Sequence, residues 1–184
     1  MKIEIGCGAK KYRGPNGNED DWVGLDRIKF PGVDHIVDLG NEDWPFLDES
    51  VSGAYSAHFV EHLDARSRIH FCNELYRVLV PGGKCTLIVP HWSSSRAYGD
   101  LTHQWPPIGE FWFLYLDKTW RNLNAPATDA AHWPQGYNCD FASEIGYLIN
   151  PIVEELKEDV GRMAIGHARE IIWDIKATLI KGSA

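Results

Sequence analysis

The chain has 184 residues, about the size of one domain, which is long enough to bury a core without cross-links. Its 44% hydrophobic and 24% charged residues are ordinary for a globular protein, and we expect a single domain over residues 1–184. A formal net charge of -8 repels a polyanion on average, so nucleic acid is an unfavourable partner. No apolar run approaches the roughly 20 residues that cross a bilayer, and we expect no membrane partner.

The cysteines give no sign of a metal centre or of disulfides. Cys7, Cys72, Cys85 and Cys139 are far apart and form no CxxC pair, and we expect no secretory leader before them. We therefore predict reduced thiols, a cytoplasmic protein and no metal ligands. Nothing in the pattern predicts an oligomeric state.

The first half of the chain predicts short strands interleaved with one helix. Apolar residues at helical spacing predict a helix over Ala65–Leu79, which Pro81-Gly82-Gly83 then ends. The segment Ala9–Asp21 is rich in glycine and proline, which predicts a loop rather than a full helix. Strands are predicted at Lys2–Ile5, Trp22–Leu25 with Asp26 at its end, His35–Val37, Val51–Phe59 and Lys84–Val89.

The second half begins with an irregular segment, His91–Pro107, of a kind that is usually functional. The patterns that follow predict a helix over Ile108–Leu123, a loop over Asn124–Gly136, a strand over Asn138–Leu148, a helix over Val153–Ala168 and a strand over Ile171–Ile180. The last two strands can form an antiparallel edge. The order as a whole predicts an α/β, doubly wound, mostly parallel sheet covered on both faces.

A glycine turn follows the first strand. Gly6 and Gly8 stand where a strand must turn sharply beneath a ligand, so that backbone N–H groups can approach it. Lys11 occupies the place of the third glycine of the dinucleotide fingerprint, which disfavours a nicotinamide cofactor. Asp26, at the end of the next strand, can accept hydrogen bonds from ribose hydroxyls. An adenosine-type ligand without a pyrophosphate fits these features.

From Lys2 to about His103 the chain resembles the class I S-adenosylmethionine-dependent methyltransferases. Glu4-Ile5-Gly6-Cys7-Gly8 looks like their first motif, Asp38-Leu39 like the adenine-contacting motif, Ser56–Leu63 like the fourth-strand motif, and Arg77–Gly83 like the "RVLKPGG" turn with Val80 in place of its lysine. The resemblance implies a seven-stranded Rossmann-like fold that binds S-adenosyl-L-methionine. The cofactor contacts that it implies are Glu4, Gly6, Cys7, Gly8, Ala9, Lys10, Asp26, Arg27, Asp38, Leu39, His58 and Phe59.

The methyl acceptor should approach the segment after Val89, because ligands of open α/β sheets bind outside the carboxyl ends of the strands. His91 and His103 are the candidate bases, since imidazole titrates near neutral pH. Asp100 and His103 can instead simply brace the loop. The expected acceptor contacts are Trp92, Ser93, Asp100, Gln104 and Trp105, and an aromatic wall of Trp92, Trp105, Trp112 and Trp120 is a further possibility. A metal held by His91, Asp100 and His103 lacks a diagnostic spacing.

A small molecule or glycan carrying a hydroxyl or amine is the acceptor we expect. Three alternatives stay open: a protein that binds the cofactor without methyl transfer, a nucleic-acid methyltransferase, and a zinc peptidase. The last rests on His58-Phe59-Val60-Glu61-His62, which matches the H-x-x-E-H pattern of inverted zinc peptidases. That pattern requires a continuous helix, whereas His58 follows a strand-like run and Asp64 is better placed to cap the next helix.

Overall fold

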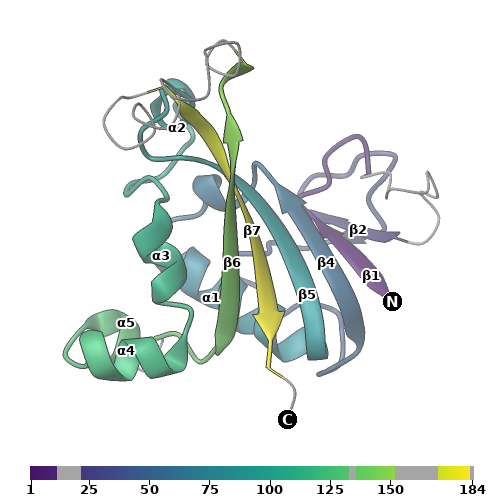
Figure 1. Cartoon of the computed structure of the whole chain (residues 1–184). Coiled ribbons are helices and arrows are strands. Elements are labelled where there is room, and N and C mark those ends of the chain that lie inside the picture. Colours follow the sequence, from purple (N-terminus) through teal and green to yellow (C-terminus); the bar gives the residue numbers. More distant parts are fainter. Residues whose placement is uncertain (12–21, 133–135, 152–169, 183–184) are drawn as a thin grey trace.

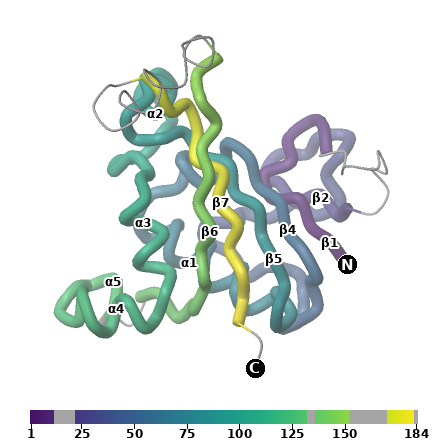
Figure 2. Tube along the Cα trace, in the orientation of Figure 1, coloured from purple at the N-terminus to yellow at the C-terminus, as the bar shows by residue number. Residues whose placement is uncertain are grey.

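A seven-stranded sheet forms the centre of the protein, with strand order β3-β2-β1-β4-β5-β7-β6. The computed structural model describes residues 1–11, 22–132, 136–151 and 170–182, and Figures 1 and 2 trace the chain. The strands are β1 (Lys2–Ile5), β2 (Trp22–Asp26), β3 (His35–Ile36), β4 (Val51–Ala57), β5 (Leu79–Pro90), β6 (Phe141–Ile149) and β7 (Ile172–Lys181).

The sheet is mixed in the way that the sequence predicts. Strands β1 to β5 pair in parallel, while β7 pairs antiparallel with both β5 and β6. The long yellow and green strands in Figure 1 are this antiparallel edge. Because β1, β2, β4 and β5 are parallel, their carboxyl ends meet at one edge of the sheet, where open α/β sheets bind their ligands.

Two strand boundaries differ from the prediction. Strand β4 ends at Ala57 rather than Phe59, because His58 has a φ of +53°, which extended backbone does not adopt. Strand β5 begins at Leu79, directly after the helix, because Leu79 pairs with Val51 before the register shifts. The Pro81-Gly82-Gly83 turn lies within this irregularity, and Gly82 has a φ of +76°.

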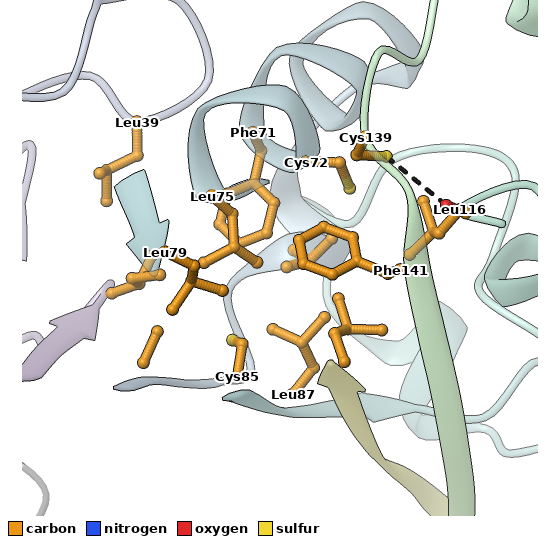
Figure 3. Packing of buried hydrophobic residues seen from close by; sticks show 14 of the residues in the cluster. Leu39, Phe71, Cys72, Leu75, Leu79, Cys85, Leu87, Leu116, Cys139 and Phe141 are labelled. Atoms are coloured by element: carbon orange, nitrogen blue, oxygen red, sulfur yellow. Dashed lines mark hydrogen bonds between the residues drawn. The ribbon is translucent and has the colours of Figure 1, made fainter. Parts of the chain in front are cut away.

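The helix α1 (Ala65–Val78) supplies one wall of the core. Asp64 caps its amino end by accepting a hydrogen bond from the Ser67 amide at 2.8 Å. Phe71, Cys72 and Leu75 project from α1 onto the buried strand residues, as Figure 3 shows. Phe71 and Leu75 each contribute on the order of 1.5–3 kcal/mol when they leave water.

The two faces of the sheet differ in exposure. Ala54, Cys85 and Leu179 stand side by side in register on one face and are buried, whereas their neighbours Tyr55 and Thr86 on the other face are only half-buried. Both α1 and α3 (Glu110–Leu114) contribute to the core on the buried face. Along the described strands, buried residues thus alternate with half-buried ones. A sheet covered equally on both faces would show a weaker alternation.

The chain between β5 and β6 folds into short helices: α2 (Arg96–Gly99), α3, α4 (Lys118–Asn124) and α5 (Asp129–His132). The prediction of a single helix over residues 108–123 is wrong. Asp117 adopts an extended backbone, and its side chain caps a new helix by accepting a hydrogen bond from the Trp120 amide. The helix predicted over residues 153–168 lies outside the described residues, as does much of the loop predicted over residues 9–21. None of the described helices has the length and apolar character that crossing a membrane requires.

Candidate functional site

The glycine turn after β1 has the backbone that the sequence predicts. Gly6 and Gly8 have φ values of +65° and +56°, a region that glycine adopts without strain. The amides of Gly6 and Cys7 both donate to the carbonyl of Leu25. A Cβ atom on Gly6 would lie 2.6 Å from Cγ of Phe59, so the turn and the Phe59 ring can approach this closely only because residue 6 is glycine.

Asp26, at the carboxyl end of β2, supports that turn. Its Oδ2 accepts a hydrogen bond from the Gly8 amide at 3.0 Å, and its Oδ1 accepts one from the Ile28 amide at 2.9 Å. A carboxylate offers about four lone-pair positions, so both oxygens can still accept hydroxyl donors from a ligand.

A cavity of about 400 Å³ opens beside this turn. Its position over the ends of four neighbouring parallel strands, β3, β2, β1 and β4, is where the fold predicts a ligand. The predicted cofactor contacts that line it are Gly6, Asp26, Arg27, Asp38, Leu39, His58 and Phe59, and the further lining residues are Val37, His62, Leu63, Thr102 and Gln104. We call this cavity the cofactor pocket.

The remaining predicted cofactor contacts do not line the pocket. Glu4 is buried within β1, and Ala9 and Lys10 are exposed. Burial raises the pKa of the Cys7 thiol to about 11, so it is a neutral packing group rather than a nucleophile. Gly8 acts through its backbone amide on Asp26.

Sequence reasoning missed Arg68, which assembles one wall of the pocket. Its side chain is 3% exposed and projects from α1. The guanidinium donates to four backbone carbonyls, those of Val60, Glu61, Gln104 and Pro106. It thereby joins the segment after β4 to the loop after β5. An arginine at helical spacing carries no signal of this role in the sequence, because its partners are backbone atoms of distant segments.

The H-x-x-E-H residues do not form the helix of an inverted zinc peptidase. His58 has a left-handed backbone, and only the short 3₁₀ helix η2 (Val60–His62) follows it. His58 Nδ1 instead lies 3.3 Å from Oε1 of Glu61, and His58 Nε2 lies 3.9 Å from Oδ2 of Asp174. The adjacent Glu61 carboxylate raises the pKa of His58 above its ordinary value, while burial opposes that rise.

The two histidines predicted as bases lie in separate networks. His91 is 4% exposed, with Nδ1 2.7 Å from Oγ of Ser93 and Nε2 3.2 Å from Oε1 of Glu110. His103 has its Nδ1 3.2 Å from the carbonyl of Ala97. Neither imidazole is among the residues that line the cofactor pocket.

The predicted acceptor contacts are spread over the loop after β5. Gln104 lines the cofactor pocket, whereas Ser93 lines a separate cavity, and Asp100 binds Thr102. Trp105 is 77% exposed. Trp92 lines an aromatic cavity of about 370 Å³ together with Pro106, Pro107, Gly109, Glu110, Phe111, Trp112 and Tyr115. The predicted wall is therefore formed in part, with Trp120 packed on Tyr115 instead.

Comparison with solved structures confirms the fold. A SAM-dependent methyltransferase from Archaeoglobus fulgidus superposes with a TM-score of 0.62 at 15% identity, covering 98% of this chain and 85% of its own. One from Methanosarcina mazei gives 0.55 at 13% identity, covering 100% and 92%. The 1,6-didemethyltoxoflavin-N1-methyltransferase of Burkholderia thailandensis gives 0.54 at 12% identity, covering 99% and 71%.

The sequence itself also carries a family signal. A model of the methyltransferase domain matches residues 21–87, which span β2 to β5, while no curated protein matches the chain. The matched segment contains Asp26, Asp38 and His58, three of the side chains at the cofactor pocket. Residues 21–87 therefore carry the signal of the methyltransferase domain, and the chain as a whole has the fold of S-adenosylmethionine-dependent methyltransferases.

Proposed function

We propose that this enzyme methylates a hydroxyl or amine of a small molecule or glycan, with S-adenosylmethionine held in the cofactor pocket. The observation that carries the proposal is the meeting of the glycine turn, Asp26 and Asp38 at one cavity over the ends of parallel strands. When bound, the cofactor supplies an electrophilic methyl group on its sulfonium.

The charge and polarity of the pocket fit this cofactor. Two carboxylates, Asp26 and Asp38, and one guanidinium, Arg27, line it. Carboxylates suit ribose hydroxyls and a cationic ligand and disfavour the pyrophosphate of a dinucleotide. The apolar side chains of Leu39 and Phe59 offer contact area for an adenine ring. These residues would hold the nucleoside, while the glycine turn admits the remainder of the cofactor.

The aromatic cavity beside Trp92 supports an acceptor with a planar or sugar ring. The loop after β5 forms a wall of both cavities, because Gln104 lines the cofactor pocket and Pro106 lines the aromatic cavity. Arg68 binds the carbonyls of both residues and so fixes one cavity relative to the other. The Burkholderia relative, which shares the fold, was solved with 1,6-didemethyltoxoflavin and S-adenosylhomocysteine, a small-molecule precedent.

Alignment of the acceptor is the main catalytic contribution that we propose. Methyl transfer is an in-line displacement, for which positioning alone supplies a large rate gain. The burial of His91 and the engagement of both its ring nitrogens favour a positioning role over direct proton transfer. His103 packs on His62 at the rim of the pocket rather than lining it.

Thermal unfolding with and without ligand tests the cofactor assignment. S-adenosylmethionine or S-adenosylhomocysteine should raise the unfolding temperature, because a ligand that binds only the folded state stabilises it by mass action. A rise with NAD and none with either sulfur compound would contradict the assignment. Incubation with methyl-labelled cofactor and small-molecule or glycan fractions then identifies the acceptor. Label found only in nucleic acid would contradict the acceptor class.

A further inference from the structure

We propose that Glu61, His62 and His103 form a binding site for a divalent transition-metal ion such as Zn²⁺ at the rim of the cofactor pocket. One side-chain ligand atom from each residue lies within 4.8 Å of the other two. Glu61 and His62 belong to η2, after β4, and His103 belongs to the loop after β5. His62 lines the pocket, as do Thr102 and Gln104 on either side of His103.

Hydrogen bonds fix the His62 ring in the state that a metal ligand needs. The hydroxyl of Thr102 donates to Oδ1 of Asp100 at 2.7 Å. Its single proton is therefore committed, and its oxygen accepts from Nδ1–H of His62 at 2.8 Å. In the resulting neutral tautomer the lone pair is on Nε2.

The same reasoning applies to His103. Its Nδ1 faces the carbonyl oxygen of Ala97 at 3.2 Å. A carbonyl only accepts, so Nδ1 carries the proton and Nε2 carries the lone pair. A metal-binding imidazole usually donates its other N–H to a carbonyl or to a side-chain acceptor, and both histidines do so here.

Glu61 supplies the negative charge. Its side chain is 5% exposed to solvent, and neither carboxylate oxygen has a hydrogen-bond partner among the described residues. A basic group beside it, Nδ1 of His58, lies 3.3 Å from Oε1 and forms an ion pair when the imidazole is protonated. A buried carboxylate without donors is costly, and a bound cation removes that cost. With two oxygens, the carboxylate can bind a metal and still face His58.

The site is held on a rigid frame. The amide of Gln104 donates to the carbonyl of Glu61 at 2.9 Å, which ties the two segments together beside the ligands. The rings of His62 and His103 meet edge to face, with centroids 4.7 Å apart. Arg68, on α1, donates hydrogen bonds to the carbonyls of Glu61 and Gln104.

Two imidazoles and one carboxylate favour zinc and similar ions over Mg²⁺ or Ca²⁺, which prefer oxygen ligands. Three protein ligands leave a coordination position for water or another oxygen. This set differs from the H-x-x-E-H interpretation, because Glu61 is a ligand here and His103 takes the place of His58. The sequence-based expectation of no metal rested on the scattered cysteines, on the spacing of His91, Asp100 and His103, and on the break between His58 and His62. The combination of Glu61, His62 and His103 depends on the contact between two distant segments.

Calorimetric titration of the chelator-stripped protein tests the site, with Zn²⁺ as the probe and Mg²⁺ as the comparison. We expect one Zn²⁺ per chain and no comparable heat from Mg²⁺. Thr102→Val should weaken Zn²⁺ binding by roughly 10- to 100-fold, the usual effect of losing an outer-shell partner. His62→Ala, His103→Ala and Glu61→Gln should each weaken it more. His70→Ala, on α1, is the matched control and should bind as the wild type does.

The His58→Ala variant separates the two zinc hypotheses. It should keep its Zn²⁺ under our proposal and lose it if His58 is a ligand, as in a peptidase. Wild-type protein that binds no Zn²⁺, or equal losses in the His70→Ala and His103→Ala variants, would overturn the proposal. A wild-type protein without Zn²⁺ binding overturns the proposal whatever the variants do, and the comparison of folded His103→Ala with His70→Ala places the ion. They are also independent of methyl transfer, so this site can fail while the proposed function stands.

Discussion

The carboxylate of Asp26 accepts the backbone amide of Gly8 at 3.0 Å and so joins the carboxyl end of β2 to the turn after β1. The residue predicted to bind a ribose is thus also a support of the glycine turn. Its second oxygen accepts the Ile28 amide, which fixes the start of the next loop. Changes at Asp26 should therefore affect binding and folding together.

Replacement of Asp26 by Ala should weaken cofactor binding by roughly 1.5–3 kcal/mol, the scale of hydrogen bonds to a charged group. It should also lower the free energy of unfolding by roughly 1–3 kcal/mol, because the Gly8 amide loses its acceptor. Calorimetry and urea unfolding measure the two effects. Asp43→Ala, at an exposed carboxylate, is the control and should change neither. Unchanged cofactor affinity in folded Asp26→Ala would remove this residue from the site.

Gly6→Ala should abolish detectable cofactor binding. A left-handed φ of +65° strains any residue with a Cβ by roughly 1–3 kcal/mol, and here the Cβ also collides with the Phe59 ring. Gly8→Ala is the matched variant, since Gly8 has a φ of +56° and nothing within 4 Å of the added atom. We expect similar backbone strain in the two variants and a much larger loss of affinity at Gly6. Equal losses of affinity would show that the contact with Phe59 has no part in the effect.

Arg68→Met should lower the free energy of unfolding by roughly 2–4 kcal/mol, because the carbonyls of Gln104 and Pro106 lose the guanidinium as their donor. The Michaelis constants for cofactor and acceptor should rise as the loop after β5 loses its anchor. Arg66→Met, at an exposed position of the same helix, should stay within about 0.5 kcal/mol of the wild type. Denaturant unfolding and steady-state kinetics test both variants, and equal effects at the two positions would contradict the anchoring role.

The local features of the cofactor site were predictable because short-range rules fix them. A glycine pair after one strand and a carboxylate after the next lie together when the two strands are neighbours in a parallel sheet, as β1 and β2 are, so the meeting of Gly6 and Asp26 followed from the sequence. The wall formed by His62 and Thr102 could not be predicted from the sequence. It depends on the hydrogen bonds by which Arg68 holds together two segments about 40 residues apart. The predicted long helix over residues 108–123 failed for a different reason, a capping aspartate within an apolar run.

Glu74 should make the protein less stable in acid. Burial acts to raise the pKa of its carboxyl, but hydrogen bonds from Arg77 and the Trp44 amide outweigh burial and lower the pKa below 4.5. A carboxyl whose folded pKa is depressed stabilises the fold above its unfolded pKa, and that contribution is lost as pH falls through the folded pKa. Glu74→Gln should therefore be less stable at pH 7, with a shallower loss of stability below about pH 4.5.

Urea unfolding at a series of pH values measures this dependence. Glu144→Gln, at an exposed carboxyl on β6, is the control and should leave the profile nearly unchanged. If the free energy of unfolding of the Glu74→Gln variant falls with decreasing pH as steeply as that of the wild type, other groups cause the acid sensitivity.

The His91→Asn variant tests whether His91 positions the acceptor loop or takes a proton. His91 bridges Ser93 on its own loop and Glu110 at the start of α3, and Tyr147 of β6 donates to the same Glu110 oxygen at 3.0 Å. Loss of the bridge should loosen the wall of the aromatic cavity, so we expect a raised Michaelis constant for the acceptor with less than about a tenfold fall in kcat. Cofactor affinity should stay near the wild-type value, because His91 does not line that pocket. Glu110→Gln should shift the Michaelis constant in the same direction, since it weakens the same bridge.

A base would behave differently: its loss should slow turnover by about 10²- to 10⁴-fold and remove the rising limb of the pH profile. Such a result would show that His91 acts as the general base. A change in the Michaelis constant with an unaltered pH profile would instead support a role in aligning the acceptor.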